Sequence, residues 1–147
     1  MKPGLEPGRE AEVTVTVTQA MVAWFEELGV VHPVYSTWAM VRHMELASRK
    51  VILPFLDPEE DAVGYSVSVT HYASTAIGEK VTARARLLRI EGNRIICQLA
   101  AFNEREQVGA DVAVRAERAL GLSRRTGRVE DRRFVLGLEV DVGQRGV

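Results

Sequence analysis

Three residues in the first half of this chain carry the side chains best suited to chemistry: Thr37, Glu45 and His71. A hydroxyl can act as a nucleophile, and a carboxylate or an imidazole can take a proton from that hydroxyl or from water. Each residue also has a simpler interpretation. Thr37 could cap a helix, Glu45 could form a surface ion pair with Arg49 one turn further on, and His71 could be a buried histidine that has found a partner.

The element that must position two of these residues is a helix predicted from about Trp38 to Leu53. An apolar stripe with steps of three and four residues indicates it, and consists of Met40, Met44, Ala47 and Val51. Either Ser36 or Thr37 can cap its start, and Pro54 stops it. Residues off the stripe are apolar too, so we expect other structure to wrap the helix and bury Glu45. Burial would raise the pKa of Glu45 towards that of a general base.

The spacing along this helix limits direct contact between its two candidate groups. If Thr37 and Glu45 are both helical, eight residues separate them by about 12 Å along the axis. A bend at Thr37, a substrate that spans the gap, or a second subunit would then be needed to complete a site.

Alternating apolar and polar residues predict strands around the helix, over Glu10–Thr18, Ala62–Tyr72, Glu79–Ile90, Arg94–Asn103 and Val108–Ala119. Val67 and Val69 share a strand face with His71, and we expect this face to meet the helix.

Gln19–Leu28 has helical spacing and predicts a short helix or turn that Gly29 closes. His43 and His32 are weaker candidates, expected on the helix surface and in a loop. One long helix against antiparallel strands is an α+β arrangement.

Composition excludes several classes of protein. The 147 residues include 19 Lys and Arg against 20 Asp and Glu, so no strong electrostatic field favours binding to nucleic acid or to an anionic membrane. No apolar stretch is long enough to span a bilayer, and the single Cys97 fits a reducing cytoplasm. The three histidines and one cysteine lack metal-ligand spacing, so we expect no metal site.

The chain divides into a domain over residues 1–120 and a C-terminal extension over 121–147. The extension holds six arginines and four acidic residues, with alternating apolar residues from Phe134 to Val142. Two interpretations stay open: a disordered tail, or an extra strand on a sheet edge or a neighbouring subunit.

Three segments, VYSTWAMVRHMELASR, SVTHYASTAIGEKV and RIEGNRIICQLAAFN, resemble the thioesterase family that includes fluoroacetyl-CoA thioesterase. The likeness covers roughly Val13 to Arg115. It implies a hot-dog fold, in which an antiparallel sheet wraps around one long central helix, and a homodimer or higher homo-oligomer with sites at the interface. It also implies an acyl-CoA thioesterase that needs no cofactor besides its CoA thioester substrate.

The same resemblance implies that Thr37, Glu45 and His71 are catalytic and that Arg115 binds substrate. The family usually has a His-Glu-Arg run that ends at the position of Arg115. This chain has Ala113 and Val114 in place of the His and the Glu. Two alternatives stay open on this fold: a non-catalytic domain that binds acyl-CoA or another small apolar ligand, and a hydratase or dehydratase. Whether Thr37 or water is the nucleophile, and which acyl group is cleaved, are also open.

Overall fold

A computed structural model of the chain describes residues 1–120. The elements follow in the order β1 (Glu10–Thr16), η1 (Gln19–Met21), β2 (Val22–Phe25), β3 (Gly29–Tyr35), α1 (Thr37–Ile52), η2 (Leu53–Phe55), β4 (Glu60–Val67), β5 (Thr70–His71), β6 (Lys80–Glu91), β7 (Arg94–Asn103) and β8 (Gln107–Leu120). The predicted C-terminal extension, with its open choice between tail and strand, lies outside the described residues.

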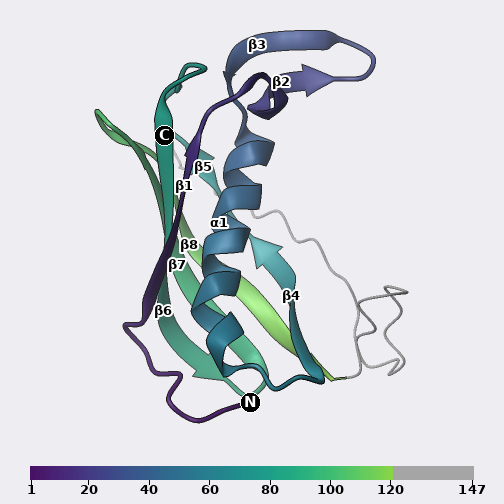
Figure 1. The fold of residues 1–147 in the computed structure, drawn as a ribbon, viewed down its shortest axis with the longest axis vertical. Helices are drawn as coiled ribbons and strands as arrows, with labels where there is room; N and C mark the ends of the chain where they lie inside the picture. The colour runs from purple at the N-terminus through teal and green to yellow at the C-terminus, as the bar shows by residue number, and fades with distance from the viewer. Residues whose placement is uncertain (121–147) are drawn as a thin grey trace, which may run out of the picture.

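Six of the strands form one antiparallel sheet in the order β1-β6-β7-β8-β4, with β5 also paired to β8. The helix α1 lies along the concave side of this sheet (Figure 1). The two-residue turn Gly92–Asn93 joins β6 to β7, and Gly92 supplies the positive φ of 62° that this turn needs. The predicted α+β arrangement is therefore confirmed.

The core lies between α1 and the sheet. Met40, Met44, Ala47 and Val51 are each fully buried, which confirms the predicted stripe. On the sheet, alternate residues of β6 (Val81, Ala83, Ala85 and Leu87) face the helix and are also buried. Alanines in the middle of β6 leave room for the methionines of the helix, because large and small side chains must alternate across a close-packed interface.

Residues 1–120 cover only one face of α1, so the expectation of a largely enclosed helix is wrong for the described part of the chain. Trp38 and Leu46 are each 43% exposed, and Glu45 and Arg42 also face outward. The sheet lies on one side of the helix, with β4 beside its C-terminal half (Figure 1).

The short helix or turn predicted over Gln19–Leu28 holds for η1 and for the turn before Gly29, and is wrong for Val22–Phe25, which forms a strand. After the short η1, the chain forms the hairpin β2–β3, which projects beyond the start of α1 (Figure 1). The helical spacing of Trp24, Phe25 and Leu28 was misleading, because these side chains are half or more exposed and form no stripe on the core. Gly29 turns the hairpin with a φ of 69° and does not end a helix.

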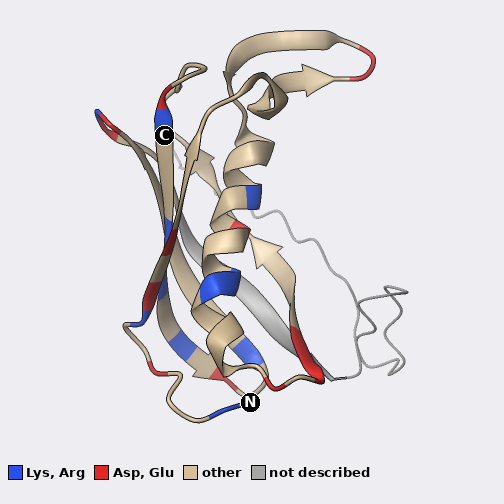
Figure 2. Ribbon diagram, in the orientation of Figure 1, with Lys and Arg blue, Asp and Glu red and all other residues tan. Residues whose placement is uncertain are grey.

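The charged side chains are spread over both layers. Acidic residues of β1 face basic residues of β6 on the outer surface, as in the pairs Glu12–Arg84 at 3.3 Å and Glu10–Arg86 at 3.8 Å. Figure 2 shows both signs interspersed along these strands and the helix. Within the described part of the chain, no helix is long and apolar enough to cross a membrane.

Candidate active site

Thr37 and His71 meet at the start of α1. Thr37 Oγ1 lies 3.0 Å from His71 Nδ1, although 34 positions separate the residues in the sequence. Thr37 is exposed at the first turn of α1, and His71 is half-buried in β5. A threonine hydroxyl in hydrogen-bond contact with an imidazole is the arrangement in which the ring can take the hydroxyl proton.

The cap of α1 explains why the Thr37 hydroxyl is free for this contact. The sequence allows either Ser36 or Thr37 as the cap, and the structure selects Ser36, whose Oγ accepts a hydrogen bond from Ala39 N at 3.2 Å. Backbone bonds hold the segment before the helix, from Tyr35 N to Thr75 O (2.8 Å) and from Ser36 N to Met21 O (2.9 Å). The hydroxyl one residue later is therefore held in place without being used by the cap.

His71 is positioned by its pairing with β8. It lies opposite Gly109, and Tyr72 N donates to Val108 O at 2.7 Å directly after it. Val67 and Val69 pack partly buried against the core, as expected for the face that they share with His71. His71 Nε2 is buried and has no hydrogen-bond partner among residues 1–120.

Glu45 lies apart from this pair, and its surroundings differ from both sequence-based interpretations. It is exposed within the single chain, so the expected burial of its carboxylate is wrong. It does not form the alternative surface pair with Arg49 either, because Arg49 bonds to Asp61 Oδ1 (2.5 Å) and to Ala62 O (2.6 Å). These bonds hold the helix against β4.

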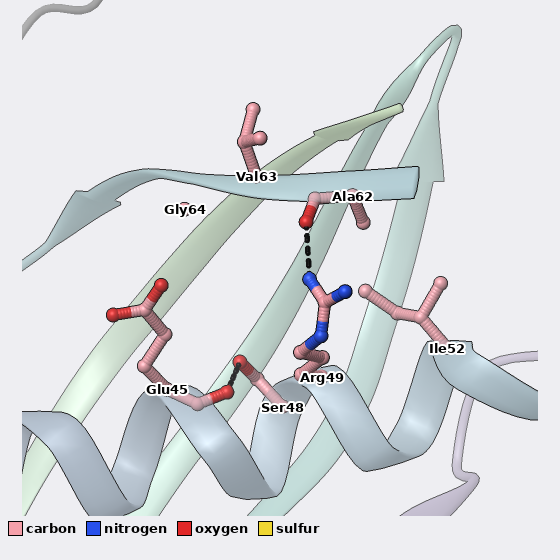
Figure 3. A pocket seen from close by; sticks show the side chains of 7 residues that line it. All are labelled: Glu45, Ser48, Arg49, Ile52, Ala62, Val63 and Gly64. Carbon is pink, nitrogen blue, oxygen red and sulfur yellow. Dashed lines mark hydrogen bonds between the residues drawn. The ribbon is translucent and has the colours of Figure 1, made fainter. Parts of the chain in front are cut away.

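The carboxylate of Glu45 points towards Gly64 of β4, at the edge of a small pocket of about 20 Å³ (Figure 3). A Cβ atom built on Gly64 would lie only 2.7 Å from Glu45 Oε1. Glycine at this position therefore allows the carboxylate to approach the strand. A cavity of this size holds about one water molecule.

Arg115 lies in β8 opposite Ser66 of β4 and Ile96 of β7. Gly109, opposite His71, is six residues earlier on the same strand, which corresponds to about 20 Å at the usual rise per residue. The fold thus brings Thr37 and His71 together, and places Glu45 and the backbone of Arg115 further along the sheet.

Comparison with known proteins identifies the family. The family model for fluoroacetyl-CoA-specific thioesterase matches residues 17–116, which includes all four candidate residues. The chain belongs to this thioesterase family. The fluoroacetyl-CoA thioesterase of Streptantibioticus cattleyicolor is 35% identical over 83 residues, which is 56% of this chain. The match spans 60% of that relative's length.

Solved structures of thioesterases share the fold. A thioesterase superfamily member from Thermus thermophilus is 41% identical with a TM-score of 0.78, and the match covers 81% of this chain and 87% of that one. A variant of the fluoroacetyl-CoA-specific thioesterase is 26% identical with a TM-score of 0.75, covering 81% and 91%. A hot-dog-like protein from Thermanaerovibrio acidaminovorans, at 19% identity and a TM-score of 0.69 over 81% and 84%, shows the fold alone. The predicted hot-dog fold is confirmed.

Two features of this thioesterase-family site were missed from the sequence. His43, expected on the helix surface, is 8% exposed, and its Nδ1 lies 2.8 Å from Tyr35 Oη. The sequence contained one signal for the burial of His43: it lies three residues after Met40 and four before Ala47, next to the apolar stripe. His32, expected in a loop, is exposed in β3. The second missed feature is Gly64 beside Glu45. No local pattern indicates it, because a glycine is needed there only once α1 packs on β4.

The described residues hold no group of three or more His, Cys, Asp or Glu side chains suited to a metal ion. Cys97 is buried in β7, and burial raises the pKa of its thiol to about 11.

Proposed function

We propose that this protein is an acyl-CoA thioesterase that hydrolyses a small or medium acyl-CoA to the acid and free CoA. The observation that carries the proposal is the contact between Thr37 Oγ1 and His71 Nδ1 at 3.0 Å, inside the region matched by the thioesterase family. A relative that is 25% identical, with a TM-score of 0.73, forms a complex with fluoroacetate and CoA, which supports a CoA thioester as the substrate. No further cofactor is part of the proposal.

In the proposed reaction, the ring of His71 accepts a proton from the nucleophile. If Thr37 is the nucleophile, its oxygen bonds to the thioester carbon, the thiolate of CoA leaves with a proton, and water then releases the acid from the threonine ester. If water attacks the thioester carbon directly, the carbon–sulfur bond breaks, CoA leaves as the thiol with the proton taken from water, and the acid forms without a threonine ester. Thr37 then orients the water or the thioester. The first turn of α1, with its positive dipole end beside Thr37, favours the charge that develops on the carbonyl oxygen.

Glu45 is proposed as the second proton-accepting group, and Arg115 as a substrate-binding residue. Within one chain, Glu45 is about 12 Å along the helix from Thr37, so it does not reach the same atom directly. We propose that a homodimer or higher homo-oligomer completes the site. The exposed Glu45 and the partly exposed edge strand β4 make this side of the molecule the proposed interface.

A cytoplasmic location belongs to the same proposal, and a lone buried thiol is compatible with a reducing compartment.

One observation favours a second candidate, a non-catalytic domain that binds acyl-CoA or another small apolar ligand. Where the family usually has His and Glu before its arginine, this chain has Ala113 and Val114. Both of these side chains lack the polar groups that could bind substrate or move protons.

An assay of free-thiol release with short, aromatic and long acyl-CoAs separates the two candidates. The proposed thioesterase releases thiol from at least one class, with saturation kinetics, and loses this activity in His71→Ala. Absence of release from every substrate, together with binding in calorimetry, would replace the thioesterase with the binding domain.

A further inference from the structure

A buried polar pair lies directly behind the candidate site and has no role in the proposed reaction. Tyr35 ends β3 and is 1% exposed, and His43, in the second turn of α1, is 8% exposed. The Tyr35 hydroxyl lies 2.8 Å from His43 Nδ1. The two rings are parallel within 4°, with centroids 5.8 Å apart.

The ring of Tyr35 also contacts His71. Their centroids are 6.3 Å apart, and the planes meet at 77°, the edge-to-face geometry that aromatic rings favour. Among the described residues, the only hydrogen bond of the His71 ring is the one from Nδ1 to Thr37, and its buried Nε2 has no partner. With Nε2 unpartnered, the contacts that set the plane of the ring are the bond at Nδ1 and the surface that Tyr35 presents.

We propose that Tyr35 and His43 form a positioning unit that holds the imidazole of His71 in the orientation required by Thr37. This inference rests on the function proposed above. Neither residue of the pair touches the reacting atoms, so both act through His71.

The pair is suited to this role because both of its members are fixed. Tyr35 is held through its backbone by the bond from its N–H to Thr75 O, and its side chain is anchored by His43, which projects from the rigid helix. Burial raises the pKa of the Tyr35 hydroxyl, so the hydroxyl keeps its proton. Burial first, and the charge of Arg42 second, lower the pKa of His43. A neutral pair therefore faces His71 and adds no charge beside it.

The competing explanation is that the pair only satisfies two polar groups inside the core. A purely structural pair would affect stability, and would not change the imidazole of His71 in protein that remains folded. A positioning pair changes that imidazole directly. The chain has three histidines, so the side-chain nitrogen spectrum of the whole protein contains three imidazoles, which single His→Ala variants assign.

The test records these nitrogen signals in the full-length protein, in Tyr35→Leu, which removes the ring, and in Tyr35→Phe, which removes only the hydroxyl. We expect the His71 nitrogens of Tyr35→Leu to move towards the average of the two tautomers, as for an unrestrained ring. The exposed His32 is the internal control and stays unchanged. If Tyr35→Leu does not fold, Tyr35→Phe decides, because it keeps nearly the same volume. An unchanged His71 spectrum in the folded variants would overturn the proposal.

Kinetics provide the second readout. A misplaced catalytic group costs rate far more than substrate affinity, so we expect Tyr35→Leu to lower kcat about tenfold or more with little change in KM. In a His71→Ala background, the same substitution should have little further effect on the residual rate. An equal loss in both backgrounds would overturn the proposal. If His71→Ala itself keeps full activity, the proposed function of His71 fails, while the nitrogen spectra still report whether Tyr35 orients the ring.

Discussion

At the scale of single residues, two adjacent hydroxyls divide two tasks that either could perform in isolation. Ser36 caps α1 through its bond from Ala39 N, and Thr37 faces His71. The Ser36 oxygen accepts from a backbone N–H of the first turn, so the helix is capped without Thr37, whose Oγ1 lies against His71 Nδ1 instead. The division leaves Thr37 available to the proposed reaction.

The first prediction concerns this contact. Thr37→Ala and His71→Ala should each lower kcat, His71→Ala by about 10²–10⁴-fold, the usual contribution of a general base. Groups that act as a unit are non-additive, so the double variant should be little slower than the slower single variant. Free-thiol release under steady-state conditions measures all three. His32→Ala, which removes an exposed histidine, is the control, and multiplicative losses would contradict a shared role.

The second prediction concerns pH and stability. The pKa of His43 is lowered from its ordinary value of 6.5, so as pH falls the unfolded chain binds this proton before the folded protein does. The contribution of neutral His43 to stability is thus fully present above about pH 6.5 and decreases as pH falls towards the folded pKa, by at most about 1.4 kcal/mol per pH unit. Denaturant midpoints of the wild type should decrease as pH falls from 7 to 5.

In His43→Gln, which keeps an amide that can bond to Tyr35 but does not titrate here, the decrease should be smaller. The carboxylates with lowered pKa values, Asp57 and Glu79, titrate below this range and do not interfere. Equal slopes in both proteins would show that His43 is not the group responsible.

At the scale of elements, the candidate site depends on how α1 lies against β4 and β8. Arg49 holds α1 to β4 through Asp61 and Ala62 O. Two glycines on these strands, Gly64 and Gly109, provide the space that the helix side chains occupy. Both have a φ outside the positive range, so the reason for glycine at each position is space.

The third prediction uses Gly64→Ala. The added methyl group would meet the tip of Glu45, with the nearest oxygen 2.7 Å away, and an exposed, flexible side chain can move aside. We expect the free energy of unfolding to change by less than about 1 kcal/mol. If Glu45 takes part in the reaction, kcat should decrease.

In a Glu45→Ala background, Gly64→Ala should have no further effect on the rate, because no carboxylate remains to be displaced. A decrease of similar size in that background would assign another role to Gly64.

The fourth prediction is the contrasting case, Gly109→Ala. Here a Cβ would lie 2.8 Å from Met40 Cε and 3.2 Å from Thr70 O, inside the fully buried core and opposite His71. Overpacking of this kind typically costs about 1–3 kcal/mol. Urea denaturation should show the loss, and Met40→Ala, which removes the clashing atoms, should reduce the additional cost of Gly109→Ala. A fully stable Gly109→Ala would show that the core can adjust around β8.

At the scale of the whole molecule, residues 1–120 cover α1 on one face only, and β1 and β4 end the described sheet. Strand edges with unpaired backbone groups invite pairing with another chain. Glu45 and the pocket beside Gly64 lie on the β4 side (Figure 3). An incomplete site at an open edge is the physical reason to expect assembly.

The fifth prediction is therefore that the protein is a homodimer or larger at micromolar concentration. Light scattering coupled to gel filtration measures the mass, against 16.3 kDa for one chain. If the partner completes the site, specific activity should decrease on dilution below the dissociation constant. A monomer with undiminished activity would contradict the proposed interface and require Glu45 to act from within one chain, or not at all.

Local patterns in the sequence determined most of the fold. Alternation over Arg94–Asn103 gives β7 with the predicted bounds, and the stripe from Met40 to Val51 gives α1 to within one residue at each end. These patterns succeed because burial on one face imposes a period of two on strands and 3.6 on helices. The resemblance supplied the fold name and the candidate residues.

Only the tertiary structure decided how the candidate groups are placed. The contact of Thr37 with His71 depends on pairing between β5 and β8, which no local pattern encodes. The spacing in Gln19–Leu28 fits a helix, yet pairing with the next strand, β3, makes a hairpin instead. Burial of His43 and exposure of Glu45 follow from the side of α1 that meets the sheet. The Thr37–His71 contact and the side of α1 that meets the sheet depend on contacts between segments distant in sequence, and the free energy of tertiary contacts outweighs local preference.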